Sequence, residues 1–311
     1  MSMPDVLGTA VGQDDDGELT ILVYVNLEGK NPGESARNIP RSLRGKSIKV
    51  ELTEPFRALG KPAPAPVPPS HTAKQTPLIQ LGTSGGWRYD LANGFCCGGT
   101  LGSLIQIGGT QYILSNYHVF ESDIASGGNS RFAETGDPII QPGLIDVNCK
   151  AAGAQNVATL EKKSSLPTSN VDASIAKVIT GMVRTDGAIL EIGPISATTI
   201  AAFIGQAVKK SGRTTGLTRS TISGISGTVT VAYDNECAGG AAFTKTFTGQ
   251  IIISNKRSQF LDGGDSGSLM VQDVAPNPQS VGLLFAGSNT LAVANPIDQV
   301  LSFLGATMVG Q

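Results

Sequence analysis

The chain has 311 residues, 40% of them hydrophobic, so it can bury a substantial core, and its length favours roughly two domains. Its formal net charge of −2 at pH 7 gives no overall field that would favour nucleic acid or an anionic membrane, so we expect neither partner. The lysine pairs at 162–163 and 209–210 are too short to form a basic patch.

Targeting signals and cysteine spacing bear on the compartment. Residues 1–6 lack the basic start and apolar core of a secretory signal, and glycine and proline interrupt the charge-free run 192–208. We therefore expect a cytoplasmic chain with no membrane span, in which cysteines stay reduced. No Cys-x-x-Cys pair or nearby histidine offers a zinc set, so we expect no metal and no organic cofactor. The cysteines expected to be free thiols are Cys96, Cys97, Cys149 and Cys237.

The first 60 residues predict a small α+β domain, in which alternating apolar runs form strands around an acidic turn. The core of such a module is modest, so we expect it to lean on its neighbour. The predicted strands are 6–11, 19–25 and 47–52, and a short helix is expected over 35–43.

Residues 61–77 hold six prolines, which favour an extended, exposed spacer. His71, one of two histidines in the chain, lies in this stretch, so we expect it to be solvated. The chain then divides into a domain over 1–60, this linker, and a larger domain over 78–311.

From residue 78 onward, short strands alternate with turns and no helix intervenes, which predicts an all-β barrel or sandwich. A C-terminal helix is expected over 295–304, where proline and aspartate precede apolar residues at helical spacing. The predicted strands are 100–107, 111–116, 156–161, 172–178, 207–211, 217–231, 247–254, 267–272 and 280–286.

His118 is the histidine with a folded setting. A β-hairpin over 98–115 delivers it in the run Leu114-Ser115-Asn116-Tyr117-His118-Val119. This setting resembles that of the trypsin-like, chymotrypsin-fold serine peptidases, whose histidine follows such a hairpin. The resemblance implies two antiparallel β-barrels with the site in the cleft between them.

Ser266 lies in the turn Gly264-Asp265-Ser266-Gly267, which suits a serine nucleophile. Acyl transfer needs a hydroxyl held out for attack and backbone N–H groups that converge on the oxygen that becomes negative. Small residues permit such a tight turn. We expect the N–H groups of Gly264 and Ser266 to form the oxyanion hole.

Asp172 is the expected carboxylate of the triad. It opens the alternating strand 171–178 and falls between His118 and Ser266, which gives the chymotrypsin-like order His, Asp, Ser. Two other aspartates remain rivals for this role, Asp146 and Asp186, the latter followed by a glycine that is typical of a turn.

The segment 208–218 reads Val-Lys-Lys-Ser-Gly-Arg-Thr-Thr-Gly-Leu-Thr and resembles a stretch of the bacterial trypsin-like enzymes. Many relatives are zymogens in which a new N-terminus neutralises the aspartate before the serine, but this chain has no evident Ile-Val-Gly-Gly activation site. We therefore expect Lys210 or Arg213 to pair with a buried Asp265 and to set the oxyanion turn without cleavage.

The resemblance spans about residues 95 to 304 and implies a serine endopeptidase that acts on protein or peptide substrates. Ser266 attacks the scissile carbonyl, His118 transfers the proton and Asp172 orients the imidazole. One alternative is a catalytically silent pseudo-peptidase that serves as a binding or scaffold module. Another is an esterase or lipase, which the absence of a Gly-x-Ser-x-Gly elbow disfavours.

In the family, the residue six before the serine lies at the base of the primary specificity pocket, and here that residue is Phe260. The remaining pocket residues are expected on the strand 282–287, and they are Phe285, Ala286 and Gly287. Without an acid at that depth the pocket should prefer small or apolar side chains, although Asp262 could still meet a basic one.

The N-terminal domain shows no catalytic constellation, so we expect it to regulate access or substrate choice. It would act either as an inhibitory segment over the cleft or as a docking module for a protein substrate. The sequence leaves the oligomeric state open.

Overall fold

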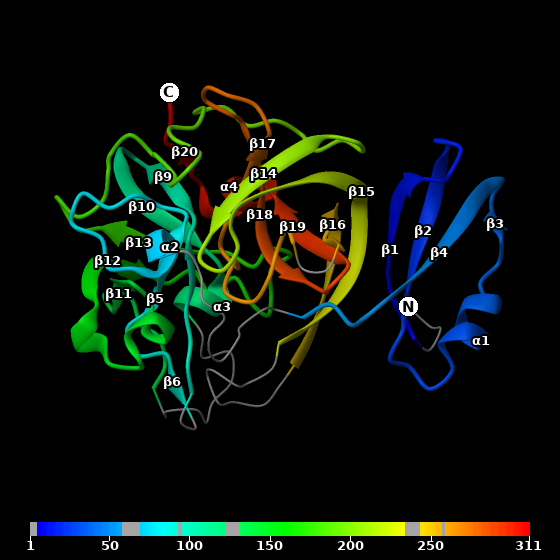
Figure 1. The fold of residues 1–311 in the computed structure, drawn as a ribbon, viewed down its shortest axis with the longest axis horizontal. Coiled ribbons are helices and arrows are strands. Elements are labelled where there is room, and N and C mark those ends of the chain that lie inside the picture. The colour runs from blue at the N-terminus through cyan, green and yellow to red at the C-terminus, as the bar shows by residue number, and fades with distance from the viewer. Residues whose placement is uncertain (1–4, 58–68, 93–94, 122–130, 234–242, 257–258) are drawn as a thin grey trace.

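The computed structural model describes residues 5–57, 69–92, 95–121, 131–233, 243–256 and 259–311. The chain is mainly β, as predicted, and most strands fall into two large sheets (Figure 1). The first sheet lies at the left of Figure 1, the second in the centre, and the N-terminal strands at the right.

The first sheet has eight strands in the order β20-β9-β10-β13-β12-β11-β5-β8. Its apolar side chains fill one core, which also receives Leu269, Leu283 and Val300 from the second half of the chain. Three of its strands, β5, β11 and β20, were not predicted. The bounds are β5 Thr83–Trp87, β8 Gly99–Leu101, β9 Ser103–Ile107, β10 Thr110–Ser115, β11 Pro138–Gln141, β12 Gln155–Glu161, β13 Ser174–Val178 and β20 Thr307–Met308; β6 (Leu91–Ala92) and β7 (Phe95–Cys96) form a separate pair.

The second sheet contains a closed ring of six strands, because β14 pairs with both β15 and β17. The C-terminal helix α4 (Ile297–Leu304) begins two residues later than predicted, since Asn295 and Pro296 belong to β19. The strands of the ring are β14 Ala207–Gly212, β15 Gly216–Tyr233, β16 Phe243–Ser254, β17 Leu269–Gln272, β18 Ser280–Gly287 and β19 Leu291–Pro296.

The N-terminal strands extend this second sheet. Strand β1 pairs antiparallel with β15, with Gly8 opposite Val229, and the sheet continues through β2, β4 and β3. Gly8 has no room for a side chain, since a Cβ there would lie 2.4 Å from the Thr228 carbonyl. The bounds are β1 Val6–Gln13, β2 Leu19–Asn26, α1 Pro32–Arg37, β3 Ser42–Leu43 and β4 Lys46–Thr53.

His71 is not solvated, so that prediction is wrong. It lies in the short helix α2 (Pro69–Thr72) and is 1% exposed. Its Nδ1 lies 3.0 Å from the Gly82 carbonyl and its Nε2 lies 2.5 Å from Glu191 Oε2. Two acceptors for two ring nitrogens explain why this polar side chain is buried.

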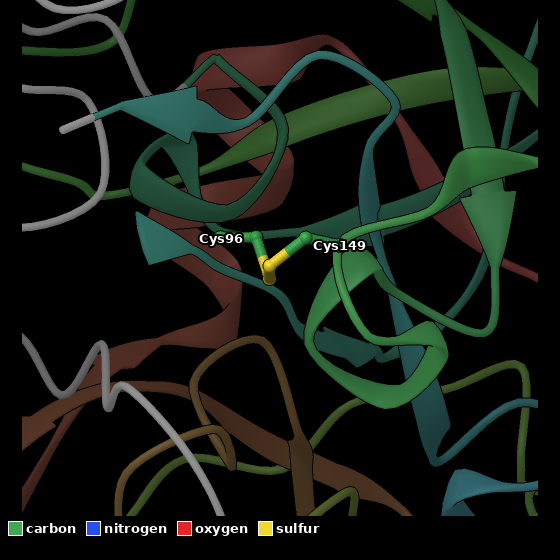
Figure 2. The surroundings of a disulfide bond; sticks show 2 residues. All are labelled: Cys96 and Cys149. Carbon is green, nitrogen blue, oxygen red and sulfur yellow. A yellow bond between two sulfur atoms is a disulfide. The ribbon is translucent and has the colours of Figure 1, made fainter. Parts of the chain in front are cut away.

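The prediction of free thiols is also wrong for the described cysteines. Cys96 and Cys149 form a disulfide (Figure 2), and no cysteine in the described ranges is free. Cys237 lies outside the described residues. Disulfides persist in oxidising compartments, so the cysteines give no support to a reducing environment. None of the helices in the described ranges has the length and apolar character needed to cross a membrane.

Replacing both Cys96 and Cys149 by serine should lower the free energy of unfolding by about 2–4 kcal/mol, because the disulfide joins residues 53 positions apart and restricts the unfolded chain. Urea denaturation followed by the fluorescence of Trp87, the only tryptophan, measures this change. An unchanged unfolding midpoint would show that the cross-link contributes no net stability.

Candidate functional site

His118 and Asp172 meet at one end of an antiparallel strand pair. Strand β10 pairs with β13 in a register that sets Ser115 opposite Ser174. His118 follows β10 in the short helix α3 (Tyr117–Phe120), and Asp172 precedes β13, so both lie beyond the same end of the pair. His118 Nδ1 is 2.7 Å from Asp172 Oδ2.

The Asp172 carboxylate is fully buried and has three donors around it. Besides the His118 ring, the Tyr117 N–H donates to Oδ1 at 2.7 Å and the Tyr233 hydroxyl donates to Oδ2 at 2.8 Å. A buried carboxylate is stable when its lone pairs are satisfied in this way. Asp172 can therefore hold the tautomer of His118 that carries its proton on Nδ1.

Tyr233 is a site residue that the sequence reasoning missed. It ends β15, and its ring lies edge-on to His118 at 5.9 Å and stacks on Phe243 at 4.9 Å. Burial, together with the charge of Asp172, raises the pKa of Tyr233 well above its usual value, so the hydroxyl remains a donor. The residue is 61 positions from Asp172, and no local motif marks it.

Ser266 lies in a turn whose other backbone N–H groups are paired. The N–H of Asp262 donates to the Asp265 side chain, that of Asp265 to the Asp262 carbonyl, and that of Gly267 to the Leu284 carbonyl. Gly263 and Ser268 donate within the turn as well. Among the described residues, the N–H groups of Gly264 and Ser266 have no hydrogen-bond partner, although both residues are buried.

The orientation of the Gly264 N–H follows from its neighbours. The Thr214 hydroxyl donates to the Gly263 carbonyl at 2.5 Å, and in a trans peptide the following N–H points the opposite way. The Thr100 hydroxyl holds the Gly264 carbonyl at 2.9 Å. Gly264 has φ +95, and a Cβ there would lie 2.5 Å from Thr214 Oγ1, so only glycine fits.

Asp265 pairs with Lys210 and not with Arg213. Lys210 Nζ is 3.1 Å from Asp265 Oδ2, and both side chains are fully buried. Burial lowers the pKa of Lys210, and the charge of Asp265 opposes that shift. The Thr214 and Thr215 N–H groups also donate to Asp265, at 2.8 and 3.1 Å.

Arg213 instead forms a bidentate pair with Asp146, at 2.9 and 2.5 Å. Asp146, a rival for the triad carboxylate, is thus committed to Arg213 and to the Ser84 hydroxyl, which donates to it at 2.5 Å. The other rival, Asp186, pairs with Arg184 at 2.5 Å. Of the three aspartates, Asp172 is the one bonded to His118.

Two further polar atoms at the site have no partner. His118 Nε2 and Ser266 Oγ are buried and unbonded, so no hydrogen bond joins them in this structure. Catalytic hydrogen bonds are often long in ligand-free enzymes. His71 differs from His118 because both of its nitrogens are occupied, which leaves His118 as the histidine with a free ring nitrogen.

The expected pocket residues do not all come together. Phe285 and Ala286 lie in a cluster with Tyr117 and Phe247, whereas Phe260 packs in a separate cluster inside the second barrel. Gly287 is bonded to Arg57 of the N-terminal part through its backbone. In the part of the chain that the structure describes, no three metal-ligating side chains gather into a possible metal site.

A family model described as the Nal1 C-terminal domain matches residues 165–294, a part that contains Asp172 and Ser266 but not His118. No curated protein matches the chain.

Several solved serine proteases are similar to the chain. A glutamic acid specific serine protease is 19% identical with a TM-score of 0.49, over 74% of this chain and 100% of that one. Protease A of Thermobifida fusca is 19% identical with a TM-score of 0.47, over 75% of this chain and 99% of that one. A chymotrypsin of Cellulomonas bogoriensis is 20% identical with a TM-score of 0.45, over the same shares, 75% and 99%. Because the sequence identities are this low and the TM-scores lie below 0.5, these proteases assign no role to any residue of this chain. The description of the site therefore depends on the distances and contacts given above.

Tyr233→Phe should lower kcat/KM for a peptide substrate about tenfold, because the Asp172 carboxylate loses one donor while the ring packing is kept. Steady-state kinetics of the variant and the wild type measure this loss.

Tyr24→Phe is the matched control, since the Tyr24 hydroxyl is buried in the same cluster without a partner. It should leave kcat/KM unchanged. An equally unchanged kcat/KM for the Tyr233 variant would mean that its hydroxyl does not act on the site.

Lys210→Met should lower the free energy of unfolding by about 3–5 kcal/mol, because Asp265 would keep a buried charge without its cation. Thermal and urea unfolding measure the loss. Lys209→Met, on the next residue of the same strand, is the control, since its 3.8 Å pair with Asp273 is partly exposed and lies away from the serine turn. Equal stability of the two variants would contradict the importance of the buried pair.

Proposed function

We propose that the chain is a serine endopeptidase. Ser266 attacks the scissile carbonyl, and His118 Nε2 takes the hydroxyl proton and later donates it to the leaving amine. Asp172 orients His118 through the 2.7 Å bond to Nδ1. The N–H groups of Gly264 and Ser266 bind the oxyanion of the tetrahedral intermediate.

The unpaired polar groups around Ser266 carry this proposal. Buried N–H groups are nearly always bonded, yet those of Gly264 and Ser266 have no partner among the described residues. Ser266 Oγ and His118 Nε2 are also buried and unbonded. These are the groups that a tetrahedral intermediate would engage: two donors for its oxyanion, a nucleophile and a base. One oxyanion donor typically contributes roughly a hundredfold to a thousandfold in rate.

The substrate follows from the same proposal. An acyl-enzyme on Ser266 forms when its oxygen bonds to the carbonyl carbon and the amine leaves with the proton from His118; water then releases the acid. We infer a protein or peptide substrate with a small or apolar side chain before the scissile bond, since Phe285 and Ala286, two of the expected pocket residues, are apolar. Asp262 remains the group that could instead meet a basic side chain.

A non-catalytic binding module is the second candidate. Two observations favour it: the absent bond between His118 and Ser266, and the family model over 165–294, whose description names no activity. Such a module would bind a peptide without forming a covalent intermediate.

Ser266→Ala should abolish both labelling by a serine-reactive phosphonate and peptide cleavage, since no other described group replaces the nucleophile. Its thermal transition should stay nearly unchanged, because Ser266 Oγ has no hydrogen bond to lose. Ser280→Ala removes another buried, unbonded hydroxyl and should keep full labelling and turnover. A wild-type chain that neither labels nor cleaves would favour the binding module.

A further inference from the structure

The segment that leaves β4 runs along the turn between β18 and β19. In Figure 1 this blue segment crosses from the N-terminal strands toward the barrels. The Thr53 hydroxyl lies 2.9 Å from those of both Ser288 and Thr290, and the Asn289 side chain donates to Glu54 at 3.3 Å. The segment is therefore held against the second barrel by side-chain contacts before it reaches Phe56.

Phe56 and Arg57 then bond to two strands of the barrel through their backbone. The Arg57 N–H donates to the Gly287 carbonyl at 3.2 Å, and the Gly287 N–H donates back to the Arg57 carbonyl at 3.1 Å, as in an antiparallel strand pair. The Ala232 N–H donates to the Phe56 carbonyl at 3.1 Å. Residues 56 and 57 thus lie between the ends of β15 and β18.

The Phe56 side chain anchors this contact. It is fully buried and lies edge-on to Tyr24 at 5.8 Å. Its cluster also contains Phe285 and Ala286, two of the expected pocket residues, and Tyr117, which precedes His118. A buried phenylalanine removes about 150–250 Å² of surface from water, so Phe56 adds a large apolar contact to this attachment.

The contact lies beside the serine turn. Arg57 and Gly287 line a cavity of about 190 Å³ together with Asp262, which opens the turn that holds Ser266. Next to Ala232, the Tyr233 side chain reaches the triad carboxylate. The two residues that bond to the segment are Ala232 at the end of β15 and Gly287 at the end of β18. The first adjoins Tyr233, which bonds to Asp172, and the second lines the cavity with Asp262.

We propose that Phe56 and Arg57 occupy, in the same molecule, the strand edge on which an extended peptide substrate pairs, so that the chain inhibits itself. The inference rests on the proposed peptidase function. Extended peptides bind to strand edges through main-chain hydrogen bonds, and side-chain pockets supply the selectivity. Gly287 presents both its N–H and its carbonyl to Arg57, so a substrate has to displace the segment to use them. The pocket filled by Phe56 then selects an aromatic or large apolar side chain in a competing peptide.

Arg57→Pro tests the proposal in the full chain. Proline has no N–H, so the variant loses the bond to the Gly287 carbonyl while Phe56 is kept. We expect kcat/KM for a short peptide to rise about three- to tenfold, mainly through a lower KM. Arg57→Ala keeps both backbone bonds and loses the same side chain, so it is the reference against which the rise is measured.

A variant that folds and labels with phosphonate but shows no rise in kcat/KM overturns the inference and leaves the peptidase function in place. If neither the variant nor the wild type labels with phosphonate, the proposed peptidase function and the inference of self-inhibition are both rejected. Should Arg57→Pro fail to fold, Phe56→Leu shrinks the anchor without emptying its pocket, and the same several-fold rise is expected; its absence has the same meaning.

Discussion

The buried carboxylate of Asp265 is the group on which the geometry of the serine turn depends. It accepts hydrogen bonds from Lys210, from the N–H of Asp262, and from Thr214 and Thr215. These donors come from the β14–β15 hairpin and from the turn itself, so a single charge locks the two segments together. An uncompensated carboxylate would be costly at this depth, which makes any other arrangement of the turn unfavourable.

Strand β15 brings the other parts of the molecule to the same place. It closes the second barrel through β14 and carries the N-terminal strands through β1. At its end, Ala232 bonds to Phe56 and Tyr233 bonds to Asp172. Strand β1, the segment at Phe56 and the Asp172 carboxylate are therefore all bonded to one five-residue stretch of β15, from Val229 to Tyr233. A displacement of the N-terminal strands would therefore act on β15, the strand whose last residue, Tyr233, donates to Asp172.

Local sequence patterns predicted much of the fold. Alternating apolar residues marked β10, β13 and β15, and the order of His118, Asp172 and Ser266 could be read because each lies in a short recognisable run. Strand β5, Thr83–Trp87, was missed since its two glycines are typical of a turn. Glycine is needed at position 85 because a Cβ there would lie 2.9 Å from the Ile140 carbonyl of the neighbouring strand. A close approach between distant segments leaves no local signal.

The remaining misses have the same origin. Three further contacts were missed, and each joins residues more than 60 positions apart. They are the bonds of Tyr233 to Asp172, of Arg213 to Asp146 and of His71 to Glu191. The second bond of His71, to Gly82, is local. The many prolines around His71 led to the prediction that it is solvated. Composition does not reveal that Glu191, 120 positions away, supplies an acceptor for its ring. The disulfide was missed because the pairing of Cys96 with Cys149, 53 positions apart, depends on how the fold brings them together.

The unpaired groups of the serine turn and of His118 bear on the choice between a peptidase and a binding module. Leaving a buried donor or acceptor unpaired costs about 1–3 kcal/mol, and a fold under no functional demand loses nothing by pairing it. Gly264, Ser266 and His118 carry four such groups, and other unpaired hydroxyls, those of Tyr24 and Ser280, lie elsewhere in the fold. The carboxylates of Asp172 and Asp265 are saturated with donors and hold His118 and the serine turn in position. In the proposed function, a reacting carbonyl with its developing negative oxygen would engage the unpaired groups.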